Sequence, residues 1–212
     1  MSSGAIGMGV GKLNLPGKPS DMPTKQAAAA VGQCELMYTY DRLFLQYNHT
    51  VAQILLTGED VDHAERRQNF ENTLERLLEL GALPIINEND TVATAEIKVG
   101  DNDTLGAIVA RCAKAELLVL LSDIDGLYTA DPRKDPAARL IPVVEEVTPQ
   151  IEALAGGVGS GLATGGMATK LRAAKMVAEV GCDMIITNGE RPEVLYDIAA
   201  GRAVGTRFVG KK

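Results

Sequence analysis

Short apolar runs recur along the chain and divide it into alternating segments. Nearly every position is apolar in residues 51–56, 83–86, 117–121 and 184–187. Such runs are typical of strands that are covered on both faces, as in a parallel sheet. A shorter run within residues 143–147 predicts one more strand.

Segments with helical spacing of apolar residues lie between these runs. Residues 66–80 are amphipathic, residues 192–199 are a short helix candidate, and residues 25–47 form a longer alanine-rich pattern that Gly32 interrupts. The apolar face of that long helix is predicted to be core or a subunit contact. The alternation predicts parallel strands joined by right-handed crossovers, and therefore an α/β fold.

The densest polar stretch begins at the end of the second run. Residues 86–105 contain five carboxylates, three asparagines and one glycine. Ligands of open α/β sheets bind at the carboxyl ends of strands, and this stretch starts there. Its second cluster, Asp101-Asn102-Asp103, precedes a helical pattern and is predicted to lie at a helix start. A cap in a solvated loop is the plain alternative, but a cap uses one side chain, and here two clusters flank Lys98.

A second candidate ligand loop is rich in glycine. Residues 156–166 contain six glycines in eleven positions, and residues 164–170 lead into an amphipathic helix predicted over residues 171–180. Glycines before a helix start let backbone N–H groups approach phosphate oxygens. The spacing is not that of a Walker A loop, and a flexible linker has a similar composition. The first nine residues form a third candidate loop, although disorder is common at a terminus.

Composition and charge limit the classes of protein that remain. The 212 residues are 46% hydrophobic, which suits one domain over residues 1–212. The net charge of −7 argues against a nucleic-acid surface. Three separated cysteines and two histidines argue against a disulfide framework or a zinc site. No run has membrane-spanning length and no signal-peptide pattern is present, so we expect a cytoplasmic protein.

Two phosphate-capable loops and a polar crevice favour a small-molecule kinase, because phosphoryl transfer needs positioning and charge neutralisation. Lys170 is the candidate cation, with a surface lysine as the alternative. Asp103 is the candidate for orienting it, with a helix cap as the alternative. Asn87, Asp90 and Asn102 suit the ammonium and carboxylate of an amino acid.

Seven motifs together resemble the glutamate 5-kinases of the amino acid kinase family, over essentially the whole chain. Two of them, GLYTADP and TGGMATK, are shared across that larger family, whereas INEND followed by GDND is sharper and points to glutamate as the acceptor. The motifs are Ser3-Gly4-Ala5-Ile6, the VGQ of residues 31–33, the INEND of residues 86–90, the GDND of residues 100–103, Ser122-Asp123, the GLYTADP of residues 126–132 and the TGGMATK of residues 164–170.

The resemblance implies a three-layer αβα sandwich with a mainly parallel central sheet. It also implies transfer of the ATP γ-phosphoryl group to the side-chain carboxylate of L-glutamate, giving γ-glutamyl phosphate, the first step of proline synthesis. Mg²⁺ would be held mainly by the nucleotide phosphates, proline would act as a feedback inhibitor, and the protein would be a homo-oligomer. The implied glutamate-binding residues are Ser3, Asp90 and Asn102, with Asn87 close by. The implied ATP-binding residues are Ser122, Asp123, Thr164, Gly165, Gly166, Met167, Ala168, Thr169 and Lys170, and Lys170 would stabilise the transferring phosphoryl group.

The chain also departs from the family pattern. The family's amino-terminal strand, lysine-bearing glycine loop, helix and strand have no counterpart in residues 1–212, nor does its carboxyl-terminal PUA domain. We therefore expect a truncated or mis-started chain whose sheet lacks central strands and has unpaired edges. Two other functions stay open: a kinase for an N-acetylated amino acid or a nucleotide, and a non-catalytic module that binds glutamate, proline or nucleotide.

Overall fold

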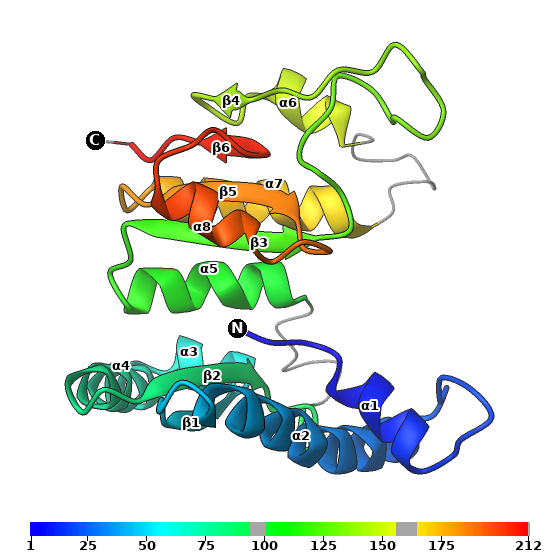
Figure 1. Cartoon of the computed structure of the whole chain (residues 1–212), viewed down its shortest axis with the longest axis vertical. Coiled ribbons are helices and arrows are strands. Elements are labelled where there is room, and N and C mark those ends of the chain that lie inside the picture. The colour runs from blue at the N-terminus through cyan, green and yellow to red at the C-terminus, as the bar shows by residue number, and fades with distance from the viewer. Residues whose placement is uncertain (94–100, 156–164, 212) are drawn as a thin grey trace. The chain divides into compact units, whose positions relative to one another are not determined.

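The computed structural model describes residues 1–93, 101–155 and 165–211. These residues form two compact units, Met1–Leu105 (unit 1) and Gly106–Lys212 (unit 2). Each unit carries its own β-sheet with helices beside it (Figure 1). One kinase domain over residues 1–212 stays a prediction.

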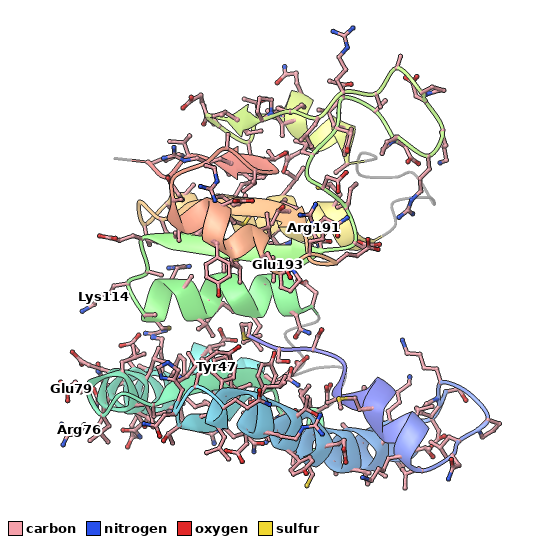
Figure 2. The ribbon with its side chains drawn as sticks, viewed as in Figure 1. Tyr47, Arg76, Glu79, Lys114, Arg191 and Glu193 are labelled. Atoms are coloured by element: carbon pink, nitrogen blue, oxygen red, sulfur yellow. The ribbon has the colours of Figure 1, made fainter. Side chains whose placement is uncertain are left out.

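The sheet of unit 1 has two parallel strands, β1 (Val51–Leu56) and β2 (Leu83–Glu88). Two helices, α3 (Gly58–Asp62) and α4 (Ala64–Glu79), connect them. Phe70 and Leu74 are the buried residues of α4, and its outer side is charged. Figure 2 shows Arg76 and Glu79 on that outer side, where their side chains form an ion pair of 2.7 Å. The predicted strand over residues 51–56 and the predicted helix over residues 66–80 are confirmed.

β2 runs two residues beyond the predicted strand of residues 83–86. Asn87 and Glu88 continue the ladder opposite Leu55 and Leu56. Both side chains are buried, although asparagine and glutamate have low intrinsic propensities for β-strands. The polar stretch therefore begins inside the sheet, and the backbone of β2 fixes its first two side chains.

Unit 1 also contains a pair of closely packed helices, α1 (Ala5–Lys12) and α2 (Met22–Leu45). A Cβ atom on Gly9 would lie 1.8 Å from the carbonyl oxygen of Ala28, and one on Gly32 would lie 1.7 Å from that of Ala5. Only glycine allows this approach of the two backbones. The prediction of a loop in the first nine residues is thus wrong from Ala5 onward, because packing on α2 offsets the low helix propensity of the glycines.

This packing predicts opposite effects for one substitution at two positions of α1. Gly9→Ala should destabilise the protein by about 1–3 kcal/mol, because the added methyl group forces the two backbones apart. Gly11→Ala should be neutral or slightly stabilising, since a Cβ atom there meets nothing within 4 Å and alanine favours the helix. Thermal unfolding of the two variants beside the wild type measures this. Equal unfolding midpoints for Gly9→Ala and Gly11→Ala would contradict the packing.

The sheet of unit 2 has four strands in the order β3-β5-β6-β4. They are β3 (Leu117–Ser122), β4 (Val143–Val144), β5 (Asp183–Asn188) and β6 (Thr206–Phe208). β3 pairs with β5 and β4 with β6 in parallel, while β5 and β6 are antiparallel. The strands predicted over residues 117–121, 143–147 and 184–187 are confirmed, with β4 shorter than expected. β6 is a strand that the sequence did not predict.

Four helices complete the described structure: α5 (Asn102–Cys112), which crosses the division between the units, α6 (Pro149–Leu154), α7 (Gly165–Ala178) and α8 (Val194–Ala199). The core of unit 2 lies between α7 and the sheet, where Leu171 and Val177 of α7 meet Leu120, Met184 and Ile186 of the strands. α7 begins at Gly165, six residues before the predicted start at residue 171. The predicted helix over residues 192–199 is confirmed as α8.

The α/β class and the mainly parallel pairing are confirmed, but the described strands form two sheets and not one. β2 pairs with β1 and β3 with β5, and no described strand pairs with members of both sheets. In that same part of the chain, no helix combines the length and the apolar character that crossing a membrane requires.

Candidate active site

A pocket in unit 1 brings together the residues predicted to bind the substrate. It has a volume of about 410 Å³ and lies where β2 ends, beside the first turn of α1 and the start of α5. Ser3, Asn87, Asp90 and Asn102 all line it, although they come from three separate segments. The full lining is Ser3, Gly4, Ala5, Ile6, Gly7, Val10, Lys18, Asn87, Glu88, Asp90, Asp101 and Asn102. We call it the unit 1 pocket.

The amide of Asn87 is held in one orientation by a chain of hydrogen bonds. The backbone N–H of Glu88 donates to Asn87 Oδ1 at 2.9 Å, and Asn87 Nδ2 donates to Gln33 Oε1 at 2.9 Å. Gln33 Nε2 donates in turn to Gln53 Oε1 at 3.2 Å. Because a backbone N–H can only donate, it fixes which side of the Asn87 amide is the oxygen, and each amide then fixes the next. Gln33 is therefore a positioning residue whose role the sequence analysis missed.

Loss of the Gln33 oxygen that accepts from Asn87 should weaken substrate binding in the unit 1 pocket. In Gln33→Leu the buried Nδ2 of Asn87 has lost its acceptor, which costs about 1–3 kcal/mol. We expect a lower unfolding temperature and a rise of about 5- to 30-fold in KM for the substrate of the unit 1 pocket, with KM for the nucleotide unchanged. Gln26→Leu is the matched control on α2, because among the described residues Gln26 makes one long hydrogen bond, of 3.4 Å, from Nε2 to Ala93 O. A Gln33→Leu enzyme with normal KM values would contradict this role.

The unit 1 pocket offers groups of both charge signs. Three carboxylates, those of Glu88, Asp90 and Asp101, line it together with the ammonium of Lys18. The first turn of α1 also lines it, behind Gly4, which has a left-handed φ of 92° and no side chain to cap the helix. Backbone N–H groups at a helix start attract anions. The pocket therefore suits a ligand that carries both an ammonium and carboxylates, such as an amino acid.

Asp101, and not Asp103, caps α5. Asp101 Oδ1 accepts the backbone N–H of Thr104 at 2.7 Å, and Oδ2 accepts the Thr104 hydroxyl at 2.9 Å. The alternative that Asp103 is a simple cap is thus wrong. Asp103 lies in the first turn of α5 and does not line the unit 1 pocket, so its role in orienting Lys170 stays a prediction.

A larger pocket in unit 2 collects residues of the predicted ATP site. It has a volume of about 980 Å³ and lies at the carboxyl ends of β3 and β5, beside the start of α7. We call it the unit 2 pocket. Its lining is Ser122, Asp123, Ile124, Asp125, Leu127, Tyr128, Ala130, Asp131, Pro132, Arg133, Lys134, Ala153, Leu154, Ala155, Gly166, Met167, Lys170 and Asn188.

Most of the predicted nucleotide-binding residues are placed at this pocket. Ser122, Asp123, Gly166, Met167 and Lys170 line it. Ala168 and Thr169 belong to the first turns of α7 without lining it, Gly165 is the first residue of that helix, and Thr164 lies outside the described residues. The sequence suggested that Lys170 lies at a helix start. Because α7 begins at Gly165, Lys170 lies instead in its second turn. The first turn of α7 and the Lys170 ammonium together suit the phosphates of a nucleotide.

The loop after β3 adds charged groups that the sequence analysis did not assign. Arg133 lies 3.6 Å from Asp123, and Lys134 lies 3.4 Å from Asp131, both as exposed ion pairs of small energetic value. The backbone N–H of Arg133 donates to Asp131 and, as the largest cause, lowers the pKa of that carboxyl. Asp131 is therefore ionised at neutral pH within the lining of the unit 2 pocket.

The described residues contain no group of three or more histidine, cysteine or acidic side chains placed to hold a metal ion. Asp123 and Asp131 of the unit 2 pocket are paired with Arg133 and Lys134.

An α/β scaffold with one pocket that suits phosphates and another that suits an amino acid is typical of a small-molecule kinase. Residues 2–188 match the amino acid kinase family, and the chain belongs to this family. Solved structures agree on the fold. An isopentenyl phosphate kinase superposes with a TM-score of 0.62 at 19% identity, covering 95% of this chain and 78% of that one. The UMP kinase of Bacillus anthracis gives a TM-score of 0.59 at 14% identity, covering 100% and 76%.

Comparison with curated proteins narrows the similarity within this family, because the similar proteins are glutamate 5-kinases. That of Clostridium tetani is 54% identical over 208 residues, which cover 98% of this chain and 78% of the relative. That of Clostridium acetobutylicum is 53% identical over 211 residues, covering 100% and 79%. That of Listeria innocua is 51% identical over 216 aligned residues, covering 100% and 78%.

Proposed function

We propose that this protein is a glutamate 5-kinase, which transfers the γ-phosphoryl group of ATP to the side-chain carboxylate of L-glutamate and so opens proline synthesis. The observation that carries the proposal is the convergence of Ser3, Asn87, Asp90 and Asn102 in the unit 1 pocket. The identity of more than 50% with glutamate 5-kinases supports the same acceptor.

The charges of the unit 1 pocket match those of glutamate. The substrate has one ammonium, which Asp90 would bind with help from Glu88 and Asp101, and two carboxylates, which suit Lys18 and the first turn of α1. Ser3 and Asn102 add hydrogen-bonding groups at the same wall. The pocket would thus bind the ammonium and the two carboxylates of glutamate, and an acceptor without these three charged groups would bind less tightly.

The reaction needs little covalent help from the protein. An oxygen of the glutamate side-chain carboxylate forms a bond to the γ-phosphorus, the bond from that phosphorus to the β,γ-bridging oxygen breaks, and ADP leaves. The attacking carboxylate is already ionised at neutral pH, so no general base is required. Lys170 would neutralise charge on the transferring phosphoryl group, and the first turn of α7 would hold the phosphates.

Mg²⁺ is part of the proposal as a companion of ATP. When bound, it would neutralise charge on the phosphate oxygens. The cation would be held mainly by the nucleotide, because phosphate oxygens and water are ligands that Mg²⁺ prefers. Proline carries the same ammonium and carboxylate as the backbone end of glutamate, so inhibition by proline at the unit 1 pocket belongs to the same proposal, as do a homo-oligomer and a cytoplasmic location.

A comparison of acceptors tests the proposal. L-glutamate, N-acetyl-L-glutamate and UMP are each offered with Mg-ATP, and ADP release is measured. We expect turnover with L-glutamate alone, because acetylation removes the ammonium that the acidic groups of the unit 1 pocket bind. Faster turnover with N-acetyl-L-glutamate or UMP would replace glutamate by that acceptor.

A further inference from the structure

Three side chains of the unit 2 pocket form a hydrogen-bonded cluster that joins two separate parts of its wall. Asn188, at the end of β5, donates from Nδ2 to Asp125 Oδ1 at 3.0 Å. Tyr128, on the loop after β3, donates its hydroxyl to Asp125 Oδ2 at 2.9 Å. All three side chains line the unit 2 pocket. The carboxylate of Asp125 thus accepts one hydrogen bond from the end of β5 and one from the loop after β3.

The orientation of each group in this cluster is fixed. Asn188 Oδ1 accepts the backbone N–H of Glu190 at 2.9 Å, so the Nδ2 side of that amide must face Asp125. The hydrogen bond to Asp125 is the largest cause of the raised pKa of Tyr128. The phenol therefore stays protonated at neutral pH and keeps donating.

Tyr128 also stands at the base of the loop that forms one side of the pocket. It forms an isolated antiparallel bridge with Leu140, and the backbone N–H of Thr129 donates to Arg139 O at 2.9 Å. The intervening residues include five that line the pocket. They are Ala130, Asp131, Pro132, Arg133 and Lys134. The position of Tyr128 consequently sets where this loop leaves the sheet.

The chemistry of this side of the pocket fits a nucleoside better than phosphates. Asp125 and Asp131 are carboxylates, which repel phosphate. Asp131 can also accept hydrogen bonds from ribose hydroxyls and from the amino group of a base. Tyr128 and Pro132 offer apolar surface for stacking. The phosphates suit the part of the lining that α7 and Lys170 contribute.

We propose that Asp125 is a positioning residue for nucleotide binding: it ties Tyr128 to Asn188 and so holds the nucleoside side of the unit 2 pocket in shape. This inference rests on the proposed function, because it takes the unit 2 pocket as the ATP site. Asp125 acts through Tyr128 and the loop behind it, whereas Lys170 lies on α7, so affinity for ATP depends on Asp125 while the rate of phosphoryl transfer does not.

Two substitutions at Asp125 separate positioning from charge. Asp125→Ala removes both hydrogen bonds and should raise KM for ATP by about 5- to 20-fold, with kcat within about twofold of wild type and KM for glutamate unchanged. Asp125→Asn should restore near-normal KM, because its oxygen accepts from Asn188 Nδ2 and its amino group donates to the Tyr128 oxygen. Asp197→Ala is the matched control: it removes the carboxylate oxygen that accepts hydrogen bonds from both Nε and Nη2 of Arg202, in the same unit and outside the pocket.

ADP binding by calorimetry, on the full chain without glutamate, gives a readout that does not depend on turnover. The proposal expects weaker ADP binding by Asp125→Ala only. Wild-type affinity in Asp125→Ala would overturn it, as would equal loss in Asp125→Asn and Asp125→Ala, which would mean that the charge of Asp125 is what the nucleotide requires. A wild-type chain that binds ADP but does not phosphorylate glutamate would overturn the proposed function and leave the Asp125 comparison intact. A wild-type chain that binds no ADP would overturn both.

Discussion

Lys170→Ala should lower kcat by about 10²- to 10³-fold with little change in KM for glutamate, because a positioned charge acts mainly on the transition state. Lys170 lines the unit 2 pocket from the second turn of α7. It shares this lining with Gly166 and Met167 of the first turn of α7. Lys170→Arg keeps the charge but changes its position, and should recover part of the rate. Steady-state kinetics with both substrates varied measures these effects.

The matched control for Lys170 lies on the same helix. Lys175 pairs with Glu152 at 2.6 Å and does not line the unit 2 pocket. Lys175→Ala removes a half-exposed ion pair, so its effect on stability should be small and kcat should remain at the wild-type level. Equal rates for Lys170→Ala and Lys175→Ala would remove Lys170 from the catalytic site.

Asp90→Asn should raise KM for glutamate by about 10- to 100-fold, because the carboxylate that would bind the substrate ammonium becomes a neutral amide of the same shape. KM for ATP should not change, since Asp90 lines only the unit 1 pocket. Initial rates over a range of glutamate concentrations give the measurement.

Asp62→Asn serves as the control for Asp90, because Asp62 is an exposed residue at the end of α3 and outside the unit 1 pocket. Its kinetic constants should equal those of the wild type. A rise in KM for ATP as large as that for glutamate in Asp90→Asn would show a general disturbance of the protein, and the ammonium-binding role would fail.

Local pattern carried most of the fold prediction. The strands β1, β3 and β5 are short apolar runs, and such runs are typical of strands in a parallel sheet. β6 has only three residues, Thr206 to Phe208, and is defined by antiparallel pairing with β5. A strand of that length has no periodicity to read, and its position depends on a partner distant in the sequence. The helix α1 was not predicted for a similar reason, because its glycine-rich sequence depends on the packing of Gly9 against Ala28 of α2.

Some residues of the candidate site could likewise be predicted from local sequence patterns, and others could not. Residues in dense polar motifs, such as Asn87, Asp90 and Asn102, could be picked out because so many polar groups after a strand need a reason. Lys18 stands alone in a proline-rich connection, and nothing local predicts that it lines the unit 1 pocket. The bonds of Gln33 to Asn87 and of Asp125 to Asn188 span 54 and 63 positions, so only the folded chain reveals them.

The most direct test of the central claim is trapping of the acyl phosphate. The wild-type chain is incubated with L-glutamate, Mg-ATP and hydroxylamine, which converts γ-glutamyl phosphate to a coloured hydroxamate. The account predicts hydroxamate that requires both glutamate and ATP and is lost in Lys170→Ala. A folded chain that is stabilised against heat by glutamate or ATP, yet forms no hydroxamate, would contradict it and identify a binding module instead.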